Sequence, residues 1–230
     1  MHIDAAIRSR KSVRRFLPLS IPKDTVETIL DLAARAPSGN NIQPWRVHVL
    51  AGDAKRAFSD DVLNAIVQEN EHHQPEYDYY PSNWFEPYLG RRRAVGYDLY
   101  ESLGISKEDR AARARQELRN YEFFDAPVGL LITLDRRFNT GSYMDLGMFI
   151  QNILLAARGR GLHTCAQAAF AWYHQIARRH VPMEDNHILA CGIALGHEDI
   201  NAPENAVLTT REKASSFSTF HGFERSAETA

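Results

Sequence analysis

The chain has 230 residues, of which 44% are hydrophobic and 24% are charged, values that suit a single globular domain spanning 1–230. Its formal net charge of −2 at pH 7 argues against nucleic acid or an anionic membrane surface as a partner. No apolar run reaches the roughly 18 residues of a membrane span. The start, Met1-His2-Ile3-Asp4, lacks a secretory pattern, and Cys165 and Cys191 form no paired motif. We therefore expect a cytoplasmic protein with reduced cysteines.

Apolar residues at helical spacing predict three helices. Two lie near the amino terminus, over residues 3–7 and about 24–35, and Pro37 follows the second. The third, over about 142–158, is apolar nearly all round. Such a helix is expected to be buried, either in a core or in a subunit interface.

Three segments have the pattern of strands. Residues 45–50 alternate between apolar and polar side chains. The run 127–134 is apolar on both faces, which predicts a central strand, and residues 187–195 form the third strand. This order of helices and strands indicates mixed α/β layers rather than an alternating doubly wound fold.

Two segments do not have the composition of a core. Residues 70–93 hold six aromatic side chains among three prolines, too polar for a strand and too proline-rich for a helix. They open a predicted excursion over 70–120. The predicted carboxyl-terminal arm, 198–230, has little periodicity, and its Phe217, Phe220 and Phe223 need a surface to bury against. A second subunit is one candidate for that surface.

Three cations and a hydroxyl lie within the five residues Arg10–Arg14 where the first helix ends, in the run Arg10-Lys11-Ser12-Val13-Arg14-Arg15-Phe16. Guanidinium, ammonium and hydroxyl donors in such density suit a phosphate dianion. A solvated basic helix end is the simpler explanation for a basic run alone, and a nucleic-acid patch fits poorly with the overall charge.

A second polar segment reads Ala36-Pro37-Ser38-Gly39-Asn40-Asn41-Ile42-Gln43-Pro44-Trp45. Its amides and hydroxyl supply donors and acceptors on a stretch made rigid by prolines, which suits the polar edge of a flavin ring. A capping turn between a helix and a strand explains the same residues. Taken with the basic run, the loop favours a flavin mononucleotide site.

The two segments together resemble the signature of the nitroreductase family of FMN enzymes. Weaker matches follow in the family's order along residues 3–213, namely Asp145-Leu146-Gly147, Gly161-Leu162, Gly192-Ile193-Ala194-Leu195-Gly196-His197 and Arg211. The aromatic excursion and the Gly161–Gln167 run resemble a longer branch of the family that includes nitrobenzoate reductases.

The resemblance implies an α+β fold, in which helices flank a mixed central sheet, built as an intertwined homodimer with FMN at the subunit interface. Carried over by position, the phosphate and one flavin edge would be held by Arg10, Lys11, Ser12, Arg14 and Arg211. The partner chain would supply Pro37, Ser38, Gly39 and Asn41. The ring would lie beside Cys165, Ala166, Gln167 and Ala168.

One position departs from the shorter members of the family. They carry a Pro-x-Glu-Gly run where this chain has Cys165-Ala166-Gln167-Ala168, so a neutral amide replaces a carboxylate. Either the Gln167 side chain or a neighbouring backbone N–H is expected near N5 and O4 of the flavin.

The resemblance implies an NAD(P)H-dependent oxidoreductase that reduces nitroaromatics, or similar planar acceptors such as quinones and activated alkenes, by ping-pong hydride transfer. The cofactor carries that chemistry, so no catalytic side chain is expected. The chain lacks a Gly-x-Gly-x-x-Gly motif for a separate nicotinamide domain. Reductive dehalogenation, oxygen-dependent flavin cleavage and flavin binding without turnover stay open as alternatives.

The aromatic excursion suggests a lid over a planar substrate, although a small cluster covering the sheet explains it as well. Candidate substrate contacts are Tyr79, Tyr80, Trp84 and Phe85. His72 and His73 are adjacent and lack further ligands in a recognisable pattern, so no metal site is expected.

Overall fold

The computed structural model describes residues 1–68 and 72–223. The α-helices of this part of the chain are α1 (Ile3–Ser9), α2 (Lys23–Ala33), α3 (Gly52–Gln68), α4 (Tyr88–Ser102), α5 (Arg110–Leu118), α6 (Thr140–Gly159) and α7 (His174–His180). Short 3₁₀ helices are η1 (Gly39–Asn41), η3 (Arg119–Asp125), η4 (Ala168–Tyr173), η5 (Pro203–Asn205) and η6 (Ala214–Ser216). No helix among the described residues is both long and apolar enough to cross a bilayer.

The strands are β1 (Phe16–Leu17), β2 (Trp45–Ala51), β3 (Val128–Asp135), β4 (His163–Gln167) and β5 (His187–Glu198). The order along the sheet is β1-β5-β3-β2, and β4 also pairs with β5. These pairs are antiparallel, and an isolated bridge from Ser12 to Thr164 runs parallel. The predicted α+β fold and the central position of β3 are confirmed, whereas the expected mixed sheet is antiparallel in all its ladders.

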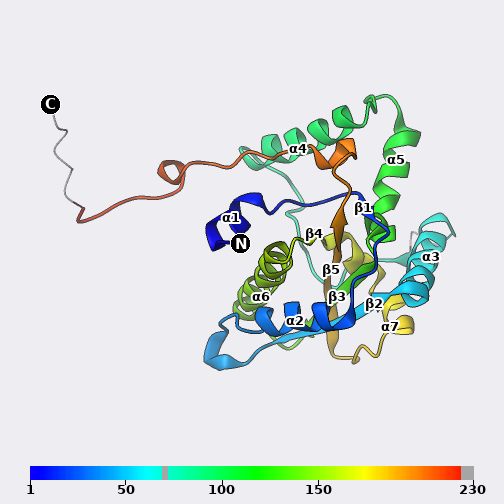
Figure 1. Cartoon of the computed structure of the whole chain (residues 1–230), viewed down its shortest axis with the longest axis horizontal. Coiled ribbons are helices and arrows are strands. Elements are labelled where there is room, and N and C mark those ends of the chain that lie inside the picture. Colours follow the sequence, from blue (N-terminus) through cyan, green and yellow to red (C-terminus); the bar gives the residue numbers. More distant parts are fainter. Residues whose placement is uncertain (69–71, 224–230) are drawn as a thin grey trace.

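Helices cover both faces of the sheet (Figure 1). Leu130, Ile132 and Leu134 of β3 pack in a cluster with α2 and α6, while Leu131 packs with α3, η3, η4 and α7. This alternation follows from the two-residue period of a strand, and because both faces are covered, the strand is apolar throughout. Trp45 of β2 stacks on Phe149 of α6 with ring centroids 4.6 Å apart, which seats α6 on the sheet.

The predicted absence of helix over 70–93 is wrong at its end, because α4 begins at Tyr88. All three prolines of the segment precede the helix, and Pro87 occupies its N-cap. A proline interrupts a helix interior, but it is tolerated at a helix start because no intrahelical N–H bond is lost there.

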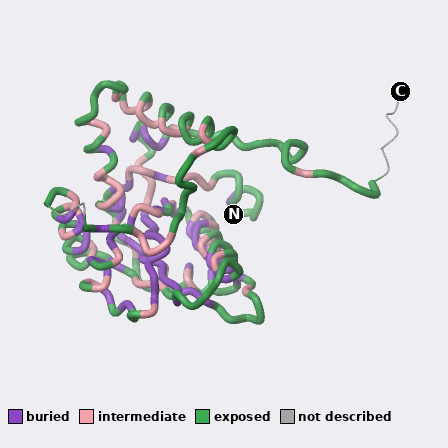
Figure 2. Tube along the Cα trace, turned by 180° about the vertical axis from the view of Figure 1, so that it is seen from behind, coloured by how far each residue is buried: buried purple, intermediate pink, exposed green. Residues whose placement is uncertain are grey.

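The segment after β5 leaves the sheet and runs along one side of the molecule before extending away from it (Figure 1). Phe217, Phe220 and Phe223 on this arm are exposed, and the arm lies clear of the buried interior (Figure 2). Further apolar exposure occurs on α1 and α6, where Ile3, Ile7, Met144 and Met148 face solvent. The three phenylalanines that were expected to be buried are therefore exposed in the single chain.

Candidate functional site

The basic segment after α1 is held in place by residues from distant parts of the chain. The N–H of Val13 donates to the carbonyl of Thr164 on β4 at 3.1 Å. The N–H of Arg14 donates to Oδ1 of Asn205 at 2.7 Å, and Nδ2 of Asn205 donates to the carbonyl of Arg15 at 2.8 Å. Asn205 is buried, so it fixes an otherwise irregular stretch by satisfying its backbone groups.

The cations of the segment divide into paired and unpaired groups. Lys11 Nζ lies 2.6 Å from Oε1 of Glu198, whose other oxygen lies 3.2 Å from His163 Nε2. Arg15 pairs with Glu204 and Asp125 at 3.1 and 3.0 Å.

Arg10, Arg14, Arg158 and Arg211 have no ion pair within the described part of the chain. Burial lowers the pKa of Arg10, and the positive charge of Arg211 lowers it further. Two like charges without a counter-charge favour the binding of an anion between them.

These unpaired cations line a cavity of about 1020 Å³ together with Lys11, Ser12, His163 and Glu198. Its walls also include Gln151, Leu154 and Arg158 of α6. The predicted phosphate-binding residues Arg10, Lys11, Ser12, Arg14 and Arg211 therefore meet in one place.

A second cavity, of about 640 Å³, lies farther toward the start of the same helix. Its walls include Gly147 and Ile150 of α6 and the segment 166–168 at the end of β4. Positions 147, 150, 154 and 158 recur at helical spacing, so one face of α6 lines both cavities. The cavity beside Arg158 is basic, and the cavity beside Gly147 is largely apolar.

The side chains of the segment 165–168 differ in how far they are buried. Cys165 is buried and Ala166 is exposed. Nε2 of Gln167 donates to the carbonyl of Asn120 at 2.6 Å, while its Oε1 is buried without a hydrogen-bond partner among the described residues. Burial raises the pKa of Cys165, and it raises that of Cys191 to about 12, so both thiols stay protonated at neutral pH.

The loop that carries Pro37, Ser38, Gly39 and Asn41 lies near the other end of α6 (Figure 1). The Gly39 N–H donates to Oδ2 of Asp145 at 3.2 Å, and the Gln43 N–H donates to Oγ of Ser38 at 3.0 Å. Asn40 and Asn41 both have positive φ, a conformation that asparagine tolerates. At 1.5 Å per helical residue, Asp145 and Arg158 are roughly 20 Å apart along α6. One chain does not bring this loop to the basic segment.

Comparison with known proteins identifies the family of this chain. The model of the nitroreductase family matches residues 7–197. This chain belongs to the nitroreductase family. It is 43% identical to a 4-nitrobenzoate reductase of Nocardioides sp. (strain LMS-CY) over 94% of this chain and 89% of that protein. It is 38% identical to a nitrobenzene nitroreductase of Ectopseudomonas oleovorans over 95% of this chain and 96% of that protein.

Solved structures resemble this nitroreductase along almost its whole length. An FMN- and NADPH-dependent nitroreductase, NfnB from sphigopyxis sp. strain HMH, has a TM-score of 0.93 at 36% identity, covering 97% of this chain and all of that one. NfnB from Mycobacterium smegmatis in complex with NADPH has a TM-score of 0.90 at 27% identity, covering 95% and 97%.

The aromatic residues predicted to contact substrate fall into two pairs in this nitroreductase. Tyr79 and Tyr80 line a third cavity, of about 780 Å³, which also borders residues 166–168. Trp84 and Phe85 line neither this cavity nor the two along α6. Trp84 packs beneath the Arg92 guanidinium, 4.8 Å from its ring centroid.

Several residues of the site escaped the sequence reasoning. Asn205, Glu198 and His163 support the basic segment, yet they lie far from it in sequence. His163 belongs to the Gly161–Gln167 run, but nothing in that run indicated a contact with the basic segment. Tyr77 lines the second cavity, and its hydroxyl donates to the carbonyl of Ala190. Burial raises the pKa of Tyr77, which keeps its hydroxyl protonated as a donor. The cluster of tyrosines between Pro75 and Pro81 is the sequence feature that could have indicated Tyr77 as a site residue.

Proposed function

We propose that this chain is an FMN-dependent, NAD(P)H-using nitroreductase that reduces nitroaromatic compounds. The observation that carries the proposal is the pair of cavities along one face of α6, with Arg10 and Arg211 at one end and Ala166 near the other. Relatives that match along most of the chain are named for the reduction of nitrobenzoate and nitrobenzene. Those names favour nitro reduction over dehalogenation, flavin cleavage or flavin storage.

The donor set fits the cofactor that this fold family implies. Arg10, Arg14 and Arg211 lack carboxylate partners within the described chain, and Arg10 and Arg211 are close enough for their charges to repel. A phosphate dianion would relieve that repulsion through charge-assisted hydrogen bonds. The Ser12 hydroxyl adds a neutral donor, and the Lys11 charge is already balanced by Glu198. These residues would hold the phosphate of FMN.

FMN supplies two-electron redox chemistry when bound, and the chain positions the reactants around it. Ala166 is exposed and its side chain is only a methyl group, so this part of the segment leaves room for a flat ring. The Gln167 side-chain amide already donates to the carbonyl of Asn120. We therefore propose that a neighbouring backbone N–H, rather than this side chain, contacts the polar edge of the ring. Tyr79 and Tyr80 border the same segment and are placed to shield a planar acceptor from water.

The enzyme is proposed to act as a homodimer. The loop 37–41 lies roughly 20 Å along α6 from the basic segment, so a complete site requires a second copy to supply that loop. The exposed apolar residues of α1, α6 and the carboxyl-terminal arm offer surface for such an association. A cytoplasmic location, where NAD(P)H is available, accords with two free, buried cysteines.

Spectroscopy of the purified protein tests the proposal. We expect a yellow protein with flavin absorbance near 450 nm (an approximate value for oxidised flavin). NADPH or NADH should bleach it under anaerobic conditions, and a nitroarene should restore the colour. A colourless protein that fails to take up added FMN would refute the cofactor assignment. Bleaching without recovery on any nitroarene would refute the reaction.

A further inference from the structure

The cavities on either side of residues 166–168 combine aromatic walls with negative charge. The 780 Å³ cavity is lined by five aromatic side chains, and Glu117 is its one charged residue among those described. In the 640 Å³ cavity the one charged residue, within the same limits, is Asp78. Lysine, arginine and histidine are missing from both sets of described wall residues. Within one chain, the described residues that line the space next to the proposed flavin ring therefore include two carboxylates and no cation.

The Glu117 carboxylate lies at the wall between two tyrosines. Its Oε1 accepts a hydrogen bond from the Tyr100 hydroxyl at 3.2 Å. Burial raises the pKa of Tyr121, Tyr173 raises it further, and Glu117 makes the smallest contribution. Tyr121 and Glu117 both line the 780 Å³ cavity. Neither Glu117 nor Asp78 forms an ion pair with any residue that the structure describes, and both side chains are exposed. Their negative charges therefore face solvent at the mouths of the two cavities.

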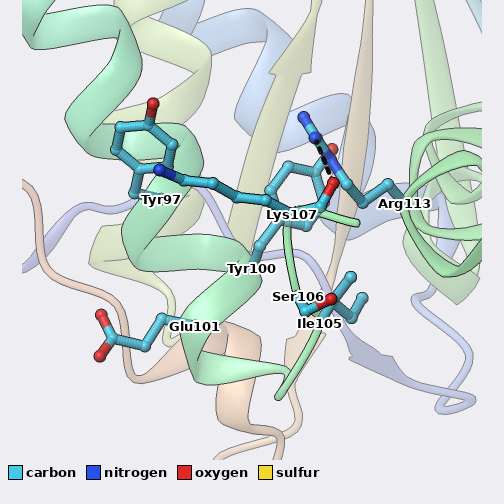
Figure 3. Close-up of a pocket in the computed structure, with 7 residues that line it drawn as sticks. All are labelled: Tyr97, Tyr100, Glu101, Ile105, Ser106, Lys107 and Arg113. Atoms are coloured by element: carbon cyan, nitrogen blue, oxygen red, sulfur yellow. Dashed lines mark hydrogen bonds between the residues drawn. The ribbon is translucent and has the colours of Figure 1, made fainter. Parts of the chain in front are cut away.

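Two cations near Tyr100, Arg113 and Lys107, line a different cavity. Arg113 shares the Tyr100 hydroxyl with Glu117, but its guanidinium lies over the Tyr100 ring, 4.7 Å from the centroid. Lys107 lies over the Tyr97 ring at 4.5 Å. Both cations line a separate cavity of about 320 Å³ between α4 and α5, which Figure 3 shows together with Glu101. Neither cation is among the described residues that line the two cavities beside residues 166–168.

We propose that Glu117 and Asp78 make this enzyme selective for uncharged nitroarenes over nitrobenzoates. The inference rests on the proposed function and narrows its substrate class. Recognition of a carboxylated substrate needs a cation or several N–H donors, whereas like charges repel, here with a strength that solvent and salt reduce because both carboxylates are exposed. Flat, neutral nitroarenes stack on the tyrosine walls without that penalty. One relative is named as a 4-nitrobenzoate reductase. The proposed preference for neutral substrates would therefore distinguish this chain from that relative.

A matched pair of acceptors tests the selectivity. Methyl 4-nitrobenzoate and 4-nitrobenzoate have the same ring and nitro group and differ in charge. We expect kcat/KM for the ester to exceed that for the acid by roughly tenfold or more, a ratio that falls as added salt screens the charges. In Glu117→Gln, the ester-to-acid ratio should fall by roughly fivefold, and further when Asp78→Asn is added.

The control and a binding measurement exclude other origins for the preference. Glu101→Gln removes a carboxylate from the neighbouring cavity of Figure 3 and should leave the ratio unchanged. Each acceptor has a fixed intrinsic reducibility that does not depend on the enzyme variant. A change in the ester-to-acid ratio between variants therefore comes from the protein. Calorimetric titration of the oxidised enzyme with benzamide and benzoate should show tighter binding of benzamide, with the difference reduced in Glu117→Gln.

The outcomes separate this inference from the function on which it rests. Equal or greater kcat/KM for 4-nitrobenzoate, or a ratio that Glu117→Gln does not shift, would overturn the selectivity and leave nitro reduction intact. Failure of both acceptors to reoxidise the reduced protein would overturn the proposed function itself, and the selectivity with it.

Discussion

Arg10 and Arg211 line the same cavity although they come from opposite ends of the chain, and the charge of Arg211 adds to burial in lowering the pKa of Arg10. The protein tolerates this repulsion because backbone bonds to Thr164 and Asn205 fix the segment that follows Arg10. A pair of unneutralised cations held in this way favours the binding of an anionic ligand.

Replacing Arg10 with alanine should weaken FMN binding about 10- to 100-fold, because one charge-assisted hydrogen bond to the phosphate is lost. Fluorescence titration of the apoprotein with FMN measures the change. Arg179→Ala, at an exposed position on α7, is the matched control and should bind FMN normally. Unchanged affinity in Arg10→Ala would contradict the phosphate assignment.

Replacing Asn205 with alanine should destabilise the protein by about 2 to 4 kcal/mol, because buried backbone groups around Arg14 and Arg15 lose their partners. Urea unfolding gives the free energy, and FMN affinity should fall along with it. Asn201→Ala removes an exposed amide from the same connection and should change stability by less than about 0.5 kcal/mol. Equal stability of the two variants would argue against a supporting role for Asn205.

Deleting residues 208–230 should convert the proposed dimer into a monomer and lower its FMN content. The deletion keeps β5, Glu198 and Asn205, so the contacts that hold the basic segment survive. It removes Arg211 and the three exposed phenylalanines of the arm. Light scattering coupled to size exclusion reports the mass. A truncated dimer would show that the arm does not build the interface.

The unfolding free energy should rise with pH up to about 6.5, in part through His163. Burial lowers the pKa of His163 below 6.5, and this effect outweighs the opposing attraction of Glu198. The unfolded chain therefore binds more protons than the folded chain between the lowered pKa and 6.5, so stability increases across that window and levels off above it. Denaturant unfolding between pH 5 and 7.5 covers this range (the unperturbed value is about 6.5).

His163→Asn should flatten this dependence, because the group that titrates differently in the two states is gone. His221→Asn, at an exposed position on the arm, should leave the slope as in the parent protein. A parent protein whose stability falls as pH rises from 5 to 6.5 would have the opposite linkage and would refute the assignment.

The sequence by itself determined the local elements and the motif that pointed to FMN. Helical and alternating periods placed α2, α6, β2, β3 and β5, because each period reflects a face buried against a neighbour. The sequence also indicated that residues 10–14 bind phosphate, because phosphate recognition needs particular hydrogen-bond donors at close spacing.

Only the tertiary structure decided which cations are left unpaired. Lys11 and Arg15 are neutralised by Glu198 and Glu204, whereas Arg10 is not. It also decided that the loop around Gly39 meets α6 at Asp145, far from the basic segment, and that Tyr79 borders residues 166–168 while Phe85 does not. These facts depend on contacts between residues distant in sequence, and no local pattern encodes them, since the same side chain serves equally as ligand donor or ion-pair partner until folding sets its neighbours.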